Sequence, residues 1–278
     1  MQINWEELNA QAISALDRGE ISRADHIFRD ACAQSDFRAY NNLGWFYYVQ
    51  GTESSLTDSV AEATRWIWRA LRLSRHPIIL QNAAALCFEN KKFAAALELL
   101  QEAKRSDGSA ALQYNIGVCL VRVGAREQAA ACFHAPNVQK CADELRASGA
   151  LHPLLAYAFC VSDEERQLAL RQYANQRTDM ERLDYFYLCV ISGAFQAALD
   201  DAEALIAEWQ LTDGVLALLA ACCVHVPAAK ARFATLLKRQ ETKKLEKLIG
   251  NRRARTKWIQ RQAFTPALAM HNGYFVTQ

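Results

Sequence analysis

Two stretches of the chain share one pattern of small and polar residues. Residues 37–51 read FRAYNNLGWFYYVQG, and residues 110–124 read AALQYNIGVCLVRVG. Each contains an Asn, an aliphatic residue and a Gly at consecutive positions, and a second Gly seven residues later. Self-similarity of this kind predicts a chain built from stacked copies of one structural unit.

The pattern resembles the tetratricopeptide repeat, a 34-residue unit of two helices with small residues where the helices cross. The resemblance implies that Gly44 and Gly117 lie at the crossings. It also implies that Gly51 and Gly124 end the first helix of their hairpins, because Gly adopts the backbone conformation that terminates a helix.

Two weaker copies complete the N-terminal part of the chain. One begins at Trp5 and the other at Pro77, with alanines at most of the small positions. The second hairpin is lengthened at residues 52–57, which also makes it similar to the Sel1-like repeat, whose loop is longer. Both resemblances imply four helical hairpins within residues 1–135.

Beyond residue 135 the pattern weakens, but the apolar period of packed helices continues. Single helices are expected at 138–148, 151–161 and 164–175, a hairpin at 179–209, and a further pair at 214–224 and 228–249. We therefore expect a degenerate helical continuation over 136–229 and a basic C-terminal helix and tail over 230–278.

Such units cannot bury their own apolar faces, so they must stack on one another. The expected fold is all-α, a right-handed superhelix of about 14–16 helices. The composition agrees, because 278 residues with only 11 Gly and 5 Pro cannot supply the many tight turns of a sheet protein.

Composition also bears on the compartment. The first residues have no basic and apolar regions typical of a signal peptide, and the longest apolar run, 215–224, is about half the length that crosses a bilayer. The nine cysteines are an odd number and lie mostly on apolar helix faces, as thiols do in a reducing compartment. We expect a cytoplasmic protein without a membrane span.

The resemblance implies a concave groove lined by the first helix of each hairpin. The position two before each crossing residue points into that groove, and it is Asn42, Asn82 or Asn115. An amide both donates and accepts, which suits the backbone of an extended peptide. Other expected groove residues are Asn9, Arg38, Asn41, Trp45, Tyr48, Gln81, Phe88, Tyr114 and Val118.

This groove predicts another protein as the partner, bound through a peptide or helix segment whose side chains enter aromatic pockets. Asn is also common at this position of the repeat, so the alternative is that each amide only satisfies its own helix. Arg38 is the only cation in the expected groove, so recognition of a C-terminal carboxylate is not implied.

Charge is unevenly distributed along the chain. Residues 230–261 contain twelve Lys or Arg and two acids, a net +10, so the remainder carries −8 of the total of +2. This segment could bind nucleic acid, attract an acidic protein, or be the solvated face of a terminal helix. Its main cations are Lys243, Lys244, Lys247, Arg252, Arg253, Arg255 and Lys257. The last stretch, 263–278, is expected to dock on the repeats or on a partner.

No pattern of catalytic residues stands out. No glycine-rich phosphate loop follows a strand, and the groups around Cys132 and Cys222 lack the paired spacing of a zinc site. We therefore expect no catalytic residue, no metal and no cofactor. The predicted function is a non-catalytic scaffold of adaptor or chaperone type, and the alternative is a regulatory or nucleic-acid-associated factor. The oligomeric state is left open.

Overall fold

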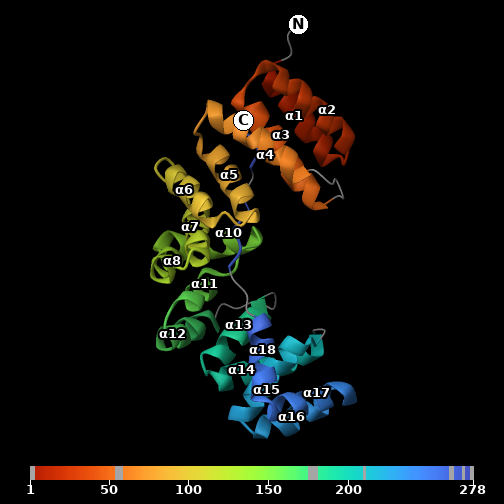
Figure 1. The fold of residues 1–278 in the computed structure, drawn as a ribbon, viewed down its shortest axis with the longest axis vertical. Helices are drawn as coiled ribbons and strands as arrows, with labels where there is room; N and C mark the ends of the chain where they lie inside the picture. The colour runs from red at the N-terminus through yellow and green to blue at the C-terminus, as the bar shows by residue number, and fades with distance from the viewer. Residues whose placement is uncertain are drawn as a thin grey trace. The chain divides into compact units, whose positions relative to one another are not determined.

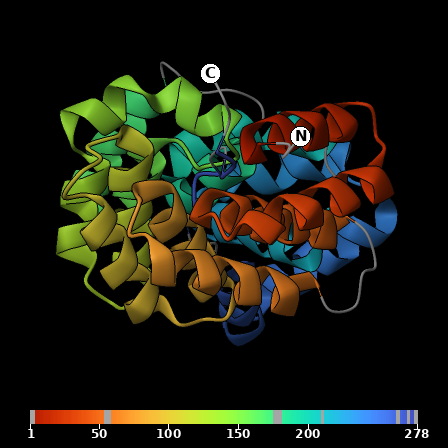
Figure 2. The same cartoon turned by 90° about the horizontal axis from the view of Figure 1, so that it is seen from above.

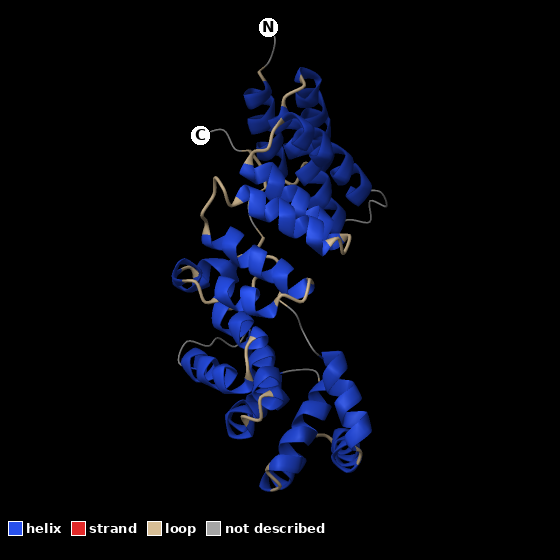
Figure 3. Cartoon of the chain, turned by 60° about the vertical axis from the view of Figure 1, so that its left-hand side comes forward, coloured by secondary structure: helices blue, strands red, loops and turns tan. Residues whose placement is uncertain are grey.

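The structure is a computed structural model, and it describes residues 4–53, 59–174, 181–208, 211–262, 266–270 and 273–275. Within these ranges the regular structure consists of eighteen α-helices and one short 3-10 helix, with no strand (Figure 3). The lengthened loop expected at residues 52–57 lies mostly outside the described residues. The all-α repeat fold is thus confirmed.

The chain forms two compact units. The N-terminal unit comprises residues 1–124 together with 268–278, and the C-terminal unit comprises residues 125–267. The described residues of the C-terminal tail, 268–270 and 273–275, therefore pack with the first repeats.

The N-terminal unit contains seven α-helices in its described residues, and the first six pair in chain order into three antiparallel hairpins (Figure 1). The helices are α1 (Trp5–Asp17), α2 (Ile21–Ala31), α3 (Phe37–Glu53), α4 (Ser59–Leu73), α5 (Pro77–Glu89), α6 (Phe93–Ala103) and α7 (Ala110–Arg122), with η1 (Cys32–Gln34) after α2. Asn4, His76 and Ser109 cap the first turns of α1, α5 and α7 by accepting from backbone N–H groups.

Two of the expected roles of glycine can be checked in this unit. Gly44 lies at the α3–α4 crossing, where a Cβ would be 2.8 Å from Ile67 Cγ1 and 2.9 Å from the Ile67 backbone N. Gly124 follows α7 with a positive φ of 87°, as expected of a helix-ending glycine. The prediction for Gly51 is wrong, because α3 continues through it to Glu53.

The C-terminal unit contains eleven helices in its described residues. They are α8 (Arg126–Phe133), α9 (Pro136–Lys140), α10 (Ala142–Ala147), α11 (Pro153–Cys160), α12 (Asp163–Ala174), α13 (Arg182–Ile191), α14 (Phe195–Glu208), α15 (Asp213–His225), α16 (Ala228–Leu236), α17 (Arg239–Gly250) and α18 (Arg252–Gln262). Helix α15 is buried from Gly214 to Cys223 and packs against both α17 and α18.

More helices are present than the 14–16 expected, because two expected helices are broken. The segment 138–148 divides into α9 and α10 at Cys141, whose ψ of 21° leaves the helical range. The segment 228–249 divides into α16 and α17 where Leu237 and Lys238 are extended, with ψ of 147° and 154°. No described helix combines the length and apolar character needed to cross a membrane.

Candidate functional site

The C-terminal tail lies along the first helices of the N-terminal hairpins. The tail is described at residues 268–270 and 273–275, and it appears in dark blue beside these helices in Figures 1 and 2. Ala269 contacts α7, Gly273 contacts α5 and α3, and Phe275 contacts α3 and α1. The tail thus runs in the direction opposite to the order of the repeats.

Two asparagines in equivalent repeat positions bind the tail backbone in the same way. Asn42 donates from Nδ2 to the Phe275 carbonyl O at 2.8 Å and accepts at Oδ1 from the Phe275 N–H at 2.7 Å. Asn115 donates to the Ala269 carbonyl O at 3.1 Å and accepts from the Ala269 N–H at 2.6 Å. Each amide therefore satisfies both backbone groups of one tail residue, as a neighbouring strand would.

Three further asparagines join these contacts into a network. Asn41 and Asn82 both donate to the Gly273 carbonyl O, at 2.7 and 2.8 Å, and Asn82 also donates to Asn41 Oδ1 at 2.8 Å. Asn9 donates to the Phe275 carbonyl O at 2.8 Å and accepts from Asn42 at 2.5 Å. All five asparagines are buried. All five bind the tail, and Asn9, Asn41, Asn42 and Asn82 also bind one another, so the amides do more than satisfy their own helices.

Gly273 lies on the indole ring of Trp45. A Cβ at Gly273 would be 2.4 Å from Trp45 Cδ2 and Cε2 and 2.6 Å from Asn82 Oδ1. Trp45 is itself buried and packs on Tyr48 with ring centroids 4.9 Å apart. The groove therefore has no room for a side chain at this position of the tail.

The two aromatic residues after Gly273 contact rings that the sequence did not single out. Tyr274 stacks on Phe28 of α2 at 6.0 Å, with an angle of 8° between the rings. Phe275 lies edge-on to Phe37 at 5.7 Å and tilted against His76 at 4.8 Å. Phe37 and His76 lie at the starts of α3 and α5, outside the crossing-residue pattern that the repeat alignment used. That alignment therefore could not find them.

Several expected groove residues have other contacts. Arg38 forms a two-point ion pair with Asp36 and lies over the Trp5 ring at 3.9 Å. Gln81 donates to Asp107 at 3.2 Å. These two side chains are held by contacts within their own unit.

Most of the aromatic residues expected in the groove are packed against neighbours in their own unit. Phe88 packs edge-on against Phe93 at 5.1 Å, and Tyr114 and Val118 are fully buried. Tyr48 supports Trp45, and burial, with Glu89 adding to it, raises the pKa of its phenol to about 12. Trp45 does contact the tail, but it contacts Gly273, which has no side chain. The register places these residues correctly on the first helices, yet their neighbours already fill the space around them.

The basic segment lies on the outer faces of α17 and α18. Leu245 and Leu248 turn inward toward α15, while the opposite faces carry the cations. Lys244 pairs with Asp213 at 3.0 Å, and Arg255 donates to the Leu248 and Ile249 carbonyl groups at 2.9 and 3.0 Å, which caps α17. All of these cations except Arg255 are exposed: Lys243, Lys244, Lys247, Arg252, Arg253 and Lys257.

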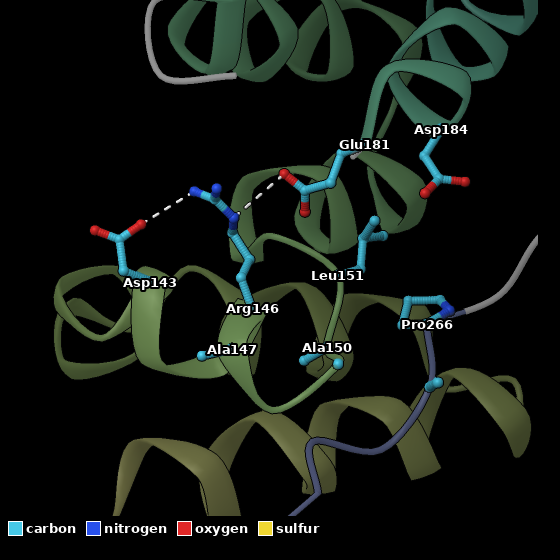
Figure 4. A pocket seen from close by; sticks show the side chains of 10 residues that line it. Asp143, Arg146, Ala147, Ala150, Leu151, Glu181, Asp184 and Pro266 are labelled. Carbon is cyan, nitrogen blue, oxygen red and sulfur yellow. Dashed lines mark hydrogen bonds and ion pairs between the residues drawn. The ribbon is translucent and has the colours of Figure 1, made fainter. Parts of the chain in front are cut away.

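A cavity of about 670 Å³ lies within the C-terminal unit (Figure 4). Arg146 lies between two carboxylates on its rim, 3.0 Å from Asp143 and 3.6 Å from Glu181. Burial, with Glu181 adding to it, raises the pKa of the Asp184 carboxyl to about 6. The sequence did not predict this cavity, because the residues that line it come from three separate segments.

A buried histidine beside this cavity makes the stability of the unit depend on pH. His152 caps α11 by accepting at Nδ1 from the Leu154 N–H at 3.1 Å, which requires the neutral ring. Burial, with Arg146 adding to it, lowers the pKa of His152 to about 4. Between pH 6.5 and 4 the unfolded chain therefore binds the extra proton, so the stability that neutral His152 contributes is complete above about 6.5 and is lost as the pH falls.

We expect this unit to lose about 2 kcal/mol of unfolding free energy through His152 between pH 7.5 and 5. The substitution His152→Asn keeps an N-cap acceptor but cannot titrate, so it should remove this share of the pH dependence. Urea unfolding of both chains at the two pH values measures it. Equal losses in the two chains would show that His152 is not the source.

Comparisons with known proteins were made by sequence and by fold. No protein-family model matches the sequence, and no curated protein matches it. Among solved structures, the chain is similar to a tetratricopeptide repeat protein from Parabacteroides merdae, with a TM-score of 0.61 and 18% identity over 93% of this chain and 98% of that chain. It is also similar to the apo form of RapI, with a TM-score of 0.52 and 12% identity over 94% of this chain and 77% of that chain. The helical hairpins, their glycine crossing and these neighbours together establish that the chain has the fold of tetratricopeptide-type repeat proteins.

Proposed function

We propose that this chain is a non-catalytic scaffold, of adaptor or chaperone type, whose N-terminal unit holds an extended segment of a partner protein. The observation that carries the proposal is the paired hydrogen bonding of Asn42 and Asn115 to both backbone groups of one residue each. Backbone recognition of this kind gives affinity for an extended segment without requiring a unique sequence.

The spacing of the two amides suits an extended chain. Phe275 lies six positions after Ala269. Their partners Asn42 and Asn115 lie on α3 and α7, which are the first helices of repeats two apart. An extended chain therefore advances about 10 Å per hairpin, since each residue spans about 3.3–3.6 Å. This is close to the spacing of packed helices, about 8–10 Å, so a longer partner segment can stay in register with successive hairpins.

Substituting both amides tests the proposal. Losing the two pairs of hydrogen bonds in Asn42→Ala with Asn115→Ala should weaken partner binding by about 2–4 kcal/mol, a loss of thirtyfold or more. Affinity capture of the tagged full-length chain from nuclease-treated native lysate should then recover a stoichiometric protein with the unsubstituted chain only. The matched control is Asn137→Ala, an exposed asparagine on α9.

The basic segment supports a second candidate, association with nucleic acid. Arg252, Arg253 and Lys257 line one shallow surface hollow on α18. The affinity for nucleic acid should fall steeply as the salt concentration rises, and it should not change when the groove asparagines are substituted. Bound material that disappears with nuclease and survives the double substitution would favour this candidate over the groove.

A further inference from the structure

The segment that occupies the groove differs sharply from the sequence before it. Residues 230–261 carry a net +10, whereas residues 262–278 contain no Asp, Glu, Lys or Arg. The groove is matched to such a segment, because its contacts with the tail come from asparagine amides and aromatic rings. Arg38, the cation expected in the groove, is paired with Asp36.

Glycine is the first feature that the groove selects. The Trp45 ring and Asn82 Oδ1 would lie within 2.6 Å of a Cβ at this position. Carbon atoms normally approach to about 3.5–4.0 Å, so even alanine requires a shift of about 1 Å. The ring cannot move away easily, because it is buried against Tyr48.

The second feature is the pair of aromatic side chains that follows the glycine. Tyr274 and Phe275 are consecutive in the tail and contact different surfaces: Tyr274 contacts Phe28, and Phe275 contacts Phe37 and His76. Phe28 is fully buried and tilted against Phe46 at 5.5 Å, so it is a fixed platform. Aromatic pairs of this kind add to affinity beyond simple area burial.

We propose that the groove recognises an uncharged, extended segment of a partner protein in which a glycine is followed by two aromatic residues. The chain's own tail is an internal copy of that ligand and competes with the partner for the same asparagines. This inference rests on the proposed function and names the ligand class of that site.

Competition follows from the tether. A ligand attached to its receptor acts at an effective concentration on the order of millimolar, so a free peptide of the same sequence must displace it. Tyr274 and Phe275 are only partly buried in the docked state, so part of each side chain is accessible to an incoming segment. The docked tail therefore lowers the affinity of the unsubstituted chain for partners, and releasing the tail raises it.

The test uses the peptide PALAMHNGYFVTQ, which has the sequence of residues 266–278. Titration calorimetry compares its binding to the unsubstituted chain and to the Gly273→Leu chain, in which the tail cannot seat on Trp45. We expect binding to the substituted chain to be at least about tenfold tighter. Peptides with alanine in place of the glycine, or of both aromatic residues, should each bind it at least about tenfold more weakly.

Each other outcome overturns the inference. Equal binding of all three peptides would remove the glycine-aromatic preference and leave backbone recognition standing. Absence of peptide binding, with capture of a partner that depends on Asn42 and Asn115, would reject the ligand class while the proposed function survives. A dimer of the unsubstituted chain that becomes a monomer on Gly273→Leu would show that the tail belongs in the groove of a second copy.

A second readout covers the case in which Gly273→Leu does not fold. Hydrogen–deuterium exchange of the tail in the unsubstituted chain reports displacement directly, because the Ala269 and Phe275 N–H groups are bonded to asparagines. Millimolar peptide should accelerate exchange of the C-terminal fragment, and the alanine peptides should not. Unchanged exchange with all three peptides would reject competition.

Discussion

Replacing Gly273 by leucine is expected to release the tail and leave the N-terminal unit folded. A leucine side chain would have to enter the space taken by the Trp45 ring and Asn82 Oδ1, 2.4 and 2.6 Å from the position of its Cβ. The tail then loses the hydrogen bonds that Asn41 and Asn82 donate to the Gly273 carbonyl O, together with the aromatic contacts next to it. The hairpins keep their own contacts, so their secondary structure should not change.

Hydrogen–deuterium exchange with mass spectrometry measures this release. We expect the fragment that contains Ala269 and Phe275 to exchange at least about tenfold faster, which corresponds to about 1.4 kcal/mol or more of lost docking free energy. The matched control is Met270→Ala, since Met270 is an exposed residue of the same tail. A protected C-terminal fragment in the Gly273→Leu chain would contradict the geometry of the Trp45 contact.

Replacing Gly44 by leucine is expected to destabilise the α3–α4 hairpin itself, whereas replacing Gly273 releases only the tail. Its Cβ would meet the Ile67 side chain at 2.8 Å and the Ile67 backbone N at 2.9 Å, and a backbone atom moves only when α4 moves. Overpacking costs typically 1–3 kcal/mol and more where the backbone must shift, whereas the better helix propensity returns less than about 1 kcal/mol. We expect about 3 kcal/mol or more of net destabilisation.

Urea unfolding followed by circular dichroism gives this free energy. Gly44→Ala should fall between the unsubstituted chain and Gly44→Leu, because it adds only the first carbon of the clash. Gly108→Leu is the matched control, since a Cβ at Gly108 meets nothing within 4 Å, and it should stay within about 0.5 kcal/mol. Since α3 also carries Asn41 and Asn42, the Gly44→Leu chain should lose tail docking too. An unchanged midpoint would show that the crossing is not tight.

Local pattern was sufficient for the repeats and for the polar centre of the groove. Asn42, Asn82 and Asn115 each lie two residues before the crossing residue of their repeat. Equivalent positions of successive first helices lie on the same face. That periodicity places the amides on the same side of successive first helices, and these three residues do contact the tail. Gly44 could be assigned to a crossing for the same reason, because only a small residue allows two helices to approach closely.

The local sequence pattern predicted helix ends wrongly where continuing the helix and ending it differ little in free energy. Gly51 does not end α3, because packing against α4 can hold a helix through a glycine that costs only about 1 kcal/mol. The break at Leu237 and Lys238 divides a segment whose apolar period predicts one helix. Both α16 and α17 pack on α15, but α16 also packs on α14 and α17 on α18. Tertiary contacts decide such cases.

The sequence by itself determined that this chain is a helical repeat protein with asparagines in register along one face. Only the tertiary structure decided what those asparagines bind, because Ala269 and Asn115 are 154 residues apart and Phe275 and Asn42 are 233 residues apart. No periodicity links a tail to the helices that it contacts across such a distance. The selection of glycine by Trp45, and of aromatic side chains by Phe28 and Phe37, likewise depends on shapes that exist only after the hairpins have stacked.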